Sequence, residues 1–235
     1  VRMDTYASRI AVLDPGDCEL LCAMGASEQI VARGALCDYP GMLATIPIAE
    51  SDNGVETEML LNLTPDVVIL SAEYAADGEL VSALQSAGIP IVVTNVADFN
   101  SLYTDITLLG AVSNHASEAS TLIASLVTSF AGIQSKATAD GTKTIYFELG
   151  TLEDGYQTAG SGTLFNDIAV MLGYRNEFED MSGYVTVTAA QIIGRSPDVI
   201  VTTTPEAEDG TGGINEILAR TGWESVQAIA DQRVY

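Results

Sequence analysis

Apolar residues occur along this chain in short runs that are rich in β-branched side chains, a pattern typical of buried strands. The runs cover residues 10–13, 67–70, 89–93, 144–147 and 199–201. Between them, many apolar positions recur every three or four residues, as on one face of a helix. No run approaches the roughly 18–20 residues that span a bilayer. The pattern therefore predicts an α/β protein without a membrane-spanning segment.

A Pro-Asp step followed by an apolar run occurs twice. The two copies are residues 64–69 (TPDVVI) and 196–201 (SPDVIV). A helical stretch precedes each copy, at residues 58–63 and 189–193. Because proline disfavours helix in the residue before it, we expect each helix to end there and the chain to turn into a buried strand.

The two halves of the chain also begin alike. A strand at 10–13 is followed by a Pro-Gly turn and a helix that ends at Gly25. A strand at 144–147 leads through the segment 160–162 (GSG) to a helix that ends at Gly173. Glycine is the usual residue just after a helix. We therefore predict two similar lobes, each with a central parallel sheet wound on both sides by helices.

Residues 101–133 have a different texture, with no proline and with apolar residues at helical spacing. They predict one long helix, or two if it is broken near Ser113-Asn114. A single helix at about 1.5 Å per residue would run to roughly 45 Å and form a stiff connection. We assign residues 1–98 to an N-terminal lobe, 99–135 to a linking helix and 136–235 to a C-terminal lobe.

Composition and charge exclude several classes of partner. Hydrophobic residues make up 47% of the 235 positions and charged residues 17%, so the chain can build a sizeable core. Nine Lys and Arg against 32 Asp and Glu give a net charge of −23. A surface this acidic repels phosphate backbones and anionic lipid, which excludes nucleic acid as a partner.

Cysteine and histidine are scarce. The odd number of cysteines, Cys18, Cys22 and Cys37, argues against a disulfide framework. Cys18 and Cys22 lie four apart on a predicted helix, where disulfide geometry is poor, so we expect free buried thiols. With His115 as the single histidine, a His-rich transition-metal site cannot be built, and we predict no metal site.

Two candidate ligand segments lie in the N-terminal lobe. The turn at 38–41 (DYPG) follows a predicted strand, and ligands of open α/β sheets bind at the carboxyl ends of strands. Asp38 and Tyr39 are therefore candidate ligand residues, with Tyr39 offering a flat ring and a hydroxyl. Tyr74, just past the strand at 67–70, is a third candidate. The alternatives are tyrosines that pack on their own loops or face solvent.

The C-terminal lobe has a glycine-rich segment at 160–163 that opens a helix. Backbone amides at Ser161 and Gly162 could contact an acidic or phosphorylated group. The alternative is a tight strand–helix turn, since the third glycine of a dinucleotide fingerprint is lacking. Tyr184, ahead of the second Pro-Asp step, either faces a ligand or lies in a solvent-facing loop.

The sequence predicts no enzyme. A Ser–His–Asp site would need His115, which we place inside the long helix and which precedes Ser161. This order differs from that of α/β-hydrolases, and their Gly-x-Ser-x-Gly motif is absent. A two-lobed enzyme acting on a nucleotide-like substrate remains as an alternative, supported by the segment 160–163 alone.

The order of these motifs resembles that of the extracytoplasmic solute-binding proteins of ABC importers for cobalamin, haem and iron-siderophores. The resemblance covers nearly the whole chain, from the first strand to the Arg-Val-Tyr close at 233–235. The Asp-Tyr-Pro turn is most similar to the cobalamin-binding branch. The resemblance implies a class III fold that holds its ligand between two lobes with little hinge closure. Tyr39 matches a cleft aromatic, and Tyr184 aligns with a position that can carry Trp.

The resemblance also implies the partners. The expected protein is a monomer without a cofactor of its own that works with an ABC permease and its ATPase. One glutamate per lobe docks onto permease arginines in this family. Glu58 matches the first, but the second position falls at Ala190. Docking through the second lobe is then lost or moved to Glu177 or Glu179, and a sensor or scavenger role is a further alternative.

Export is implied too, with a lipid anchor on an N-terminal cysteine in Gram-positive bacteria. The sequence begins Val-Arg-Met-Asp, without the apolar segment of a leader. The family usually continues past the Arg-Val-Tyr strand into a terminal helix. We therefore expect at Tyr235 either a trimmed chain or a short variant whose C-terminal lobe lacks that helix.

For the cargo, cobalamin or a related corrinoid is the first choice. Haem is the second, and it would need Tyr39 or a methionine as its axial ligand. Ferric siderophores rank third because most are anionic and the chain has only nine basic residues.

Overall fold

The computed structural model describes residues 5–52, 54–206 and 212–235. Its internal contacts divide the chain into two compact units. The N-terminal unit comprises Val1–Val96 and Asn100–Val127, and the C-terminal unit comprises Ala97–Phe99 and Thr128–Tyr235.

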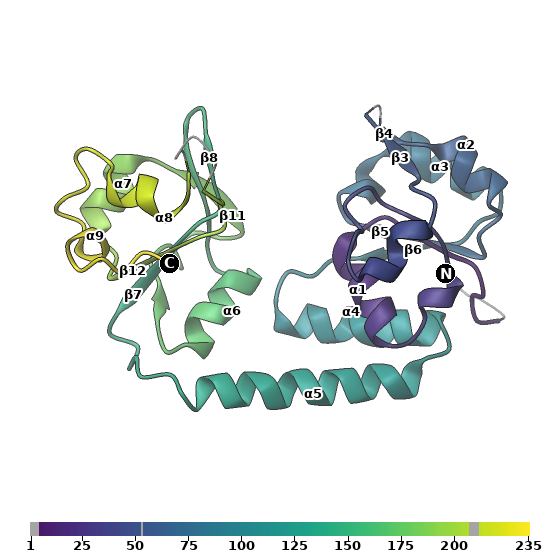
Figure 1. Cartoon of the computed structure of the whole chain (residues 1–235), viewed down its shortest axis with the longest axis horizontal. Coiled ribbons are helices and arrows are strands. Elements are labelled where there is room, and N and C mark those ends of the chain that lie inside the picture. Colours follow the sequence, from purple (N-terminus) through teal and green to yellow (C-terminus); the bar gives the residue numbers. More distant parts are fainter. Residues whose placement is uncertain (1–4, 53, 207–211) are drawn as a thin grey trace. The chain divides into compact units, whose positions relative to one another are not determined.

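The N-terminal unit is built on a four-stranded parallel sheet in the order β2-β1-β5-β6, of which β5 and β6 are labelled in Figure 1. The strands are β1 (Ile10–Val12), β2 (Ile30–Arg33), β5 (Val67–Ser71) and β6 (Ile91–Thr94). The α-helices are α1 (Pro15–Ala23), α2 (Thr57–Asn62), α3 (Gly78–Ser86) and α4 (Phe99–Val112). Short 3-10 turns η1 (Ser27–Gln29), η2 (Gly41–Thr45) and η3 (Tyr74–Ala76) and a hairpin of β3 (Glu50–Ser51) and β4 (Gly54–Val55) complete it.

Alternate residues of the central strands build two separate cores. Ile10 and Val12 of β1 face a cluster shared with α1 and α4, whereas Ala11 and Leu13 face a cluster shared with α2 and α3. β5 alternates in the same way. Because side chains on a strand point to opposite faces in turn, a continuous apolar run serves both cores. This confirms the prediction of a parallel sheet wound on both sides.

The segment predicted as one long helix, or as two helices broken near Ser113-Asn114, forms two helices. α4 ends at Val112, and α5 (Ala116–Gln134) begins after a break at residues 113–115. Asn114 has a φ of 64°, which no α-helix accommodates. The prediction that His115 lies inside the helix was wrong: it lies in the break, where its Nδ1 is 2.8 Å from the Ser113 carbonyl oxygen.

The second of these helices is notable for its hydropathy. α5 has 19 residues and a mean hydropathy of 1.2, so it is long and apolar enough to cross a membrane by length and composition alone. The search for continuous apolar runs did not detect this helix, because its apolar residues are interrupted by small polar ones. The boundary between the two units falls within α5, between Val127 and Thr128.

The C-terminal unit has two three-stranded sheets. One is parallel in the order β10-β7-β12, and the other is antiparallel in the order β11-β9-β8. The strands are β7 (Thr144–Glu148), β8 (Gly150–Leu152), β9 (Gly155–Ala159), β10 (Arg175–Asn176), β11 (Tyr184–Val187) and β12 (Val199–Thr202). The helices are α6 (Leu164–Met171), α7 (Ala189–Arg195), α8 (Gly213–Leu218) and α9 (Gln227–Ala230).

The parallel sheet of this unit is again covered on both faces. Ile145 and Phe147 of β7 pack with α6, and Tyr146 between them packs with α7, α8 and α9. The antiparallel sheet is a difference between the units that the sequence analysis did not predict. It places Tyr184 in a strand rather than in a loop.

The two Pro-Asp steps have the same structure in both units. The residues before the prolines, Thr64 and Ser196, have φ values of 45° and 53° and end their helices. The Asp66 carboxylate accepts hydrogen bonds from the backbone just before β1, at 2.7 and 2.9 Å, and that of Asp198 accepts one from Thr144 at the start of β7, at 2.9 Å. Each aspartate thus fixes the neighbouring strand of its own sheet.

Candidate functional site

The carboxyl edge of the N-terminal sheet carries the loop that joins β2 to η2. Arg33, the last residue of β2, is 6% exposed and holds this loop from inside. Its guanidinium donates hydrogen bonds to the carbonyls of Ile46, Gly34 and Cys37 at 3.2, 3.2 and 3.0 Å. Arg33 was not among the residues predicted from the sequence, although a single cationic residue at the end of an apolar strand can indicate such an anchor.

Between these fixed points the loop presents side chains to solvent. Tyr39 is 67% exposed, Leu36 76% and Met42 61%. Asp38 is exposed as well. The structure therefore places both predicted ligand residues on an accessible loop, and it adds two apolar neighbours that the sequence analysis did not single out. A tyrosine, a leucine and a methionine held on one anchored loop suit a large apolar ligand surface.

Tyr74 lies at the same edge but differs in setting. It begins η3 just after β5, is half-buried, and packs against the core shared with α2 and α3. Its hydroxyl donates a hydrogen bond to Glu50, and burial together with that carboxylate raises its pKa. Glu50 also accepts a hydrogen bond from the Ala35 amide. Glu50, with Tyr74 bound to it, thus holds the Ala35 end of residues 34–42, which we call the Tyr39 loop.

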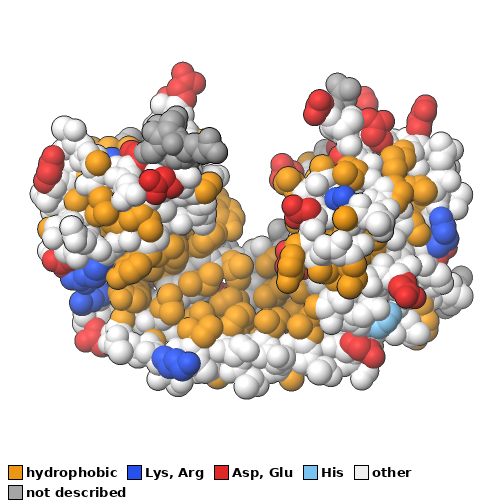
Figure 2. Space-filling view, in the orientation of Figure 1, with side chains coloured by type: hydrophobic (Ala, Val, Ile, Leu, Met, Phe, Trp, Pro, Cys, Tyr) orange, Lys and Arg blue, Asp and Glu red, His pale blue; other side chains and the backbone are white. Residues whose placement is uncertain are grey.

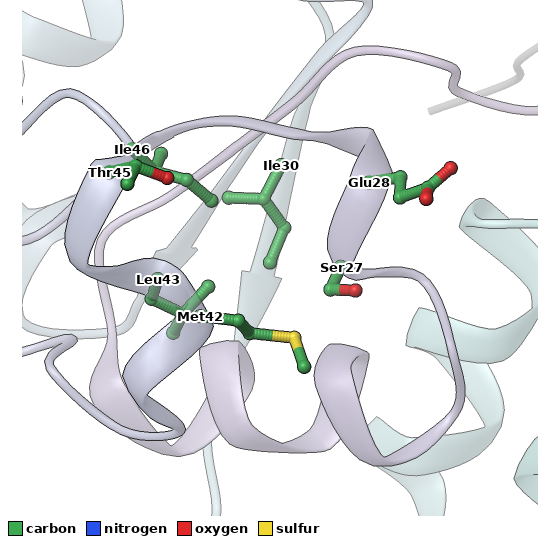
Figure 3. A pocket seen from close by; sticks show the side chains of 7 residues that line it. All are labelled: Ser27, Glu28, Ile30, Met42, Leu43, Thr45 and Ile46. Carbon is green, nitrogen blue, oxygen red and sulfur yellow. The ribbon is translucent and has the colours of Figure 1, made fainter.

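The N-terminal unit also contains a cavity of about 500 Å³. It lies beside η2 and the start of β2, and Figure 3 shows Ile30, Met42 and Leu43 directed toward its interior while the Glu28 carboxylate points away. None of the predicted site residues lines it. Met42 is the residue common to this cavity and to the exposed surface of the Tyr39 loop.

Two buried carboxyl groups lie near the ends of β1 and β6. Asp17, in the first turn of α1, accepts a hydrogen bond from the Thr94 hydroxyl at 2.6 Å. Burial raises the pKa of Asp17 to about 7, and the charges of Asp14 and Asp105 add to the effect. Burial also raises the pKa of Asp105, which accepts a hydrogen bond from the Asn95 amide. Burial thus favours the protonated, uncharged form of both carboxyl groups.

In the C-terminal unit, backbone hydrogen bonds bring residues 160–162 and 181–184 together. The Gly160 amide donates to Gly183 at 2.8 Å, and the Gly183 amide donates to Ser161 at 2.9 Å. The Ser161 hydroxyl donates to the Met181 carbonyl at 2.8 Å, so it is already engaged. Gly162 has open space around its Cα and a φ of 71°, a conformation that favours glycine.

Tyr184 lies next to this junction, at the start of β11. It is 54% exposed and packs edge-on against Phe165 at a centroid distance of 6.5 Å. The glycine-rich segment leads into α6, whose N-cap Thr163 accepts a hydrogen bond from the Asn166 amide. The structure thus groups the three predicted residues of this unit and leaves the Tyr184 ring accessible.

A buried ionic network lies at the carboxyl end of β7. The Arg220 guanidinium makes two hydrogen bonds of 2.7 Å to Glu148 and further ones to Glu216. It also stacks on the rings of Tyr156 and Trp223, with distances of 4.7 and 4.8 Å to their centroids. Burial lowers the pKa of Arg220, but its hydrogen bonds and ion pairs with Glu148 and Glu216 outweigh this and hold the pKa above its ordinary value.

Positive charge is scarce at the surface. Figure 2 shows few blue side chains on the face drawn, against many red ones. Every arginine among the described residues already donates hydrogen bonds to a carbonyl or a carboxylate: Arg9, Arg33, Arg175, Arg195, Arg220 and Arg233. Within that same described part of the chain, no group of three or more His, Cys, Asp or Glu side chains could hold a metal ion.

The predicted docking positions are equivalent in the two units. Glu58 is the second residue of α2 and is exposed, and Ala190 is the second residue of α7 and is exposed. Of the neighbours considered for the second docking group, Glu177 is half-buried and its pKa is raised by that burial. Glu179 is exposed and pairs with Arg175 at 3.3 Å.

Comparison with known sequences gives consistent matches. The profile of a family described as periplasmic binding protein matches residues 10–235. An uncharacterised ABC transporter substrate-binding lipoprotein of Bacillus subtilis, YvrC, is 28% identical over 232 residues, covering 97% of this chain and 71% of that protein. A vitamin B12-binding protein of Yersinia pestis is 26% identical over 196 residues, covering 83% of this chain and 69% of that protein.

Solved structures share the fold at low sequence identity. A possible iron-binding solute-binding protein of Staphylococcus epidermidis matches with a TM-score of 0.84 at 24% identity, over 98% of this chain and 89% of that one. The haem-binding protein HutB of Vibrio cholerae matches at 0.84 and 23%, over 97% and 89%. The vitamin B12-binding protein BtuF of Vibrio cholerae matches at 0.76 and 19%, over 97% and 86%.

Proposed function

We propose a cargo for this chain, which belongs to the periplasmic binding protein family. The chain is an ABC transporter substrate-binding protein of the cobalamin, haem and iron class, not an enzyme. The proposed cargo is cobalamin or a related corrinoid. The fold of the chain is that of the class III periplasmic binding proteins. The protein captures this cargo outside the cytoplasm, as a monomer, and delivers it to an ABC permease and its ATPase.

The observation that carries the choice of cargo is the engagement of the arginines. Haem carries two carboxylates and most ferric siderophores are anionic, so both need cationic partners. The described arginines are already bonded to carbonyl or carboxylate groups of the protein. A corrinoid instead presents a flat apolar macrocycle with neutral amide side chains, which aromatic rings, hydroxyls and backbone amides can bind.

In the proposed binding site, each unit provides one accessible aromatic ring. Tyr39 and its neighbour Asp38 contact the ligand from the N-terminal unit, and Tyr184 and the Gly162 backbone contact it from the C-terminal unit. The Ser161 amide donates to the Met181 carbonyl at 2.7 Å, so Ser161 instead holds Gly162 in place. Ring faces of tyrosine bury apolar ligand area at about 25 cal/mol per Å², and their hydroxyls remain free for the amides of the ligand. Tyr74 acts indirectly, through the support that it and Glu50 give to the Tyr39 loop.

Equilibrium binding of cyanocobalamin to a Tyr39→Ala variant tests the site. We expect affinity to fall by about 10- to 100-fold, which corresponds to roughly 1–3 kcal/mol for loss of a stacked aromatic anchor. Tyr6→Ala is the matched control, because Tyr6 is also an exposed tyrosine of the N-terminal unit, at 62%. An unchanged dissociation constant for Tyr39→Ala, with intact wild-type binding, would remove Tyr39 from the site.

Docking to the permease is tested separately from binding. Glu58→Gln is expected to abolish transport stimulated by the protein in vesicles that contain its permease and ATPase, with no change in cargo affinity. The Glu179→Gln variant tests whether the C-terminal unit docks through Glu179 in place of the glutamate expected at Ala190. Normal transport with Glu58→Gln would refute the docking role of Glu58.

Haem is the second candidate, and one observation favours it. Tyr39 and Met42 expose an oxygen and a sulfur donor on one loop, and both atoms are known axial ligands of haem iron. A haem complex would show a Soret band that shifts in the Tyr39→Phe variant, whereas a corrinoid protein would give no saturable change on addition of haemin.

A further inference from the structure

Two of the three cysteines converge on one point at the end of β1. Cys18 lies in α1 and Cys37 lies in the Tyr39 loop, and both are buried. Their sulfur atoms lie 3.9 and 4.0 Å from the same atom, the carbonyl oxygen of Val12. The Cys37 thiol also donates to the Leu13 carbonyl at 3.4 Å.

The two thiols interact with each other as well. A side-chain hydrogen bond between Cys18 and Cys37 raises the pKa of Cys18 and lowers that of Cys37. Cys37 is therefore the better nucleophile of the two, because the thiolate is the species that attacks a disulfide. Cys22, one turn further along α1, is only partly buried, and burial raises its pKa.

We propose that Cys18 and Cys37 form a disulfide bond that joins α1 to the Tyr39 loop, and that Cys22 stays reduced. The Cys37 thiolate attacks one sulfur of a disulfide oxidant, which forms a mixed disulfide with Cys37 and releases the other half of the oxidant as a thiol. The Cys18 thiol then loses its proton, attacks the mixed disulfide at Cys37, and releases the second thiol of the oxidant. Two protein thiols are thereby oxidised, and one oxidant disulfide is reduced to two thiols.

The position of this bond gives it a consequence for the loop. The Cys37 carbonyl is already held by Arg33, and the disulfide would fix the side chain of the same residue to α1. Asp38 and Tyr39 would then extend from a point anchored through both backbone and side chain. The formation of the bond in the cell rests on the extracytoplasmic location, whereas its chemistry can be tested on the purified chain whatever the cargo.

The test counts and locates the thiols of the whole chain. Reduced, denatured protein is refolded in a buffer of reduced and oxidised glutathione, denatured in acid, alkylated and mapped by mass spectrometry after digestion. We expect one alkylated cysteine, Cys22, and a peptide pair linked through Cys18 and Cys37. Three alkylated cysteines, or a disulfide that includes Cys22, would overturn the proposal.

Alanine variants provide the controls and keep the result independent of any one substitution. Cys22→Ala should form the same linked peptide pair as the natural chain. Cys37→Ala should leave Cys18 and Cys22 both alkylated, because two cysteines four residues apart on a helix have poor disulfide geometry. A Cys18–Cys22 bond in Cys37→Ala, at the yield seen for the natural chain, would show that the oxidation lacks the specificity that the structure assigns.

Discussion

Replacement of Asp17 by asparagine removes a carboxyl group that folding buries away from water, near two other carboxyl groups. Asp17 is 2% exposed, and its pKa is raised to about 7 from an ordinary 3.8. The folded protein binds this proton more tightly than the unfolded chain does. The contribution of Asp17 protonation to the free energy of unfolding is therefore fully present below about pH 4. It is lost as the pH rises through about 7. Asparagine has nearly the same shape and no charge at any pH.

The magnitude follows from the two pKa values. Each unit of pKa corresponds to about 1.4 kcal/mol, so the full difference is worth about 4 kcal/mol. Between pH 5 and pH 8 the natural protein should lose about 3 kcal/mol of unfolding free energy through this group alone. The amide introduced by Asp17→Asn keeps a hydrogen bond with Thr94, whose hydroxyl also lies 3.3 Å from the Leu70 carbonyl.

Urea denaturation at pH 5 and pH 8, followed by circular dichroism, measures the effect. Asp17→Asn should exceed the natural protein in stability at pH 8 and lose most of that advantage at pH 5. Asp52→Asn is the matched control, since Asp52 is an exposed aspartate of the same unit and should leave the pH dependence unchanged. Equal pH dependence in Asp17→Asn and in the natural protein would refute the assignment of this titration to Asp17.

Two further substitutions test packing and charge. A Cβ at Gly34 would lie 2.1 Å from the Leu13 carbonyl oxygen, whereas one at Gly41 would meet no atom within 4 Å. Gly34→Ala should therefore lower the free energy of unfolding by about 1–3 kcal/mol. In a thermal melt, the melting temperature of Gly41→Ala should stay near that of the natural protein. Glu148→Gln breaks a buried ion pair and should cost about 3–5 kcal/mol, with part of the loss recovered in the double variant with Arg220→Met. Additive losses would contradict a coupled pair.

The sequence predicted those parts of the fold that depend on local signals. The residues before Pro65 and Pro197 end their helices as the proline rule requires, and Gly25 and Gly173, with φ values of 87° and 78°, follow helices that end where predicted. The two apolar runs that form β1 and β5 identified the double-sided core. In each case the determining residues lie within a few positions of one another.

The rest depends on contacts between distant residues. The hairpin of β8 and β9 is short and partly polar, so no apolar run marks it. The role of Tyr74 follows from Glu50, and that of Arg33 follows from backbone carbonyls up to 13 positions away. Whether Tyr39 and Tyr184 are exposed also depends on such distant contacts. The sequence could therefore suggest them as ligand residues but could not show that they are accessible.

The central claim, a corrinoid cargo, is tested most directly by calorimetric titration of the purified protein with cyanocobalamin and, in parallel, with haemin. We expect saturable one-to-one binding of cyanocobalamin at submicromolar affinity and much weaker binding of haemin. Saturable binding of haemin with no heat on addition of cyanocobalamin would contradict the proposed cargo, and would assign to haem the surface presented by Tyr39 and Met42.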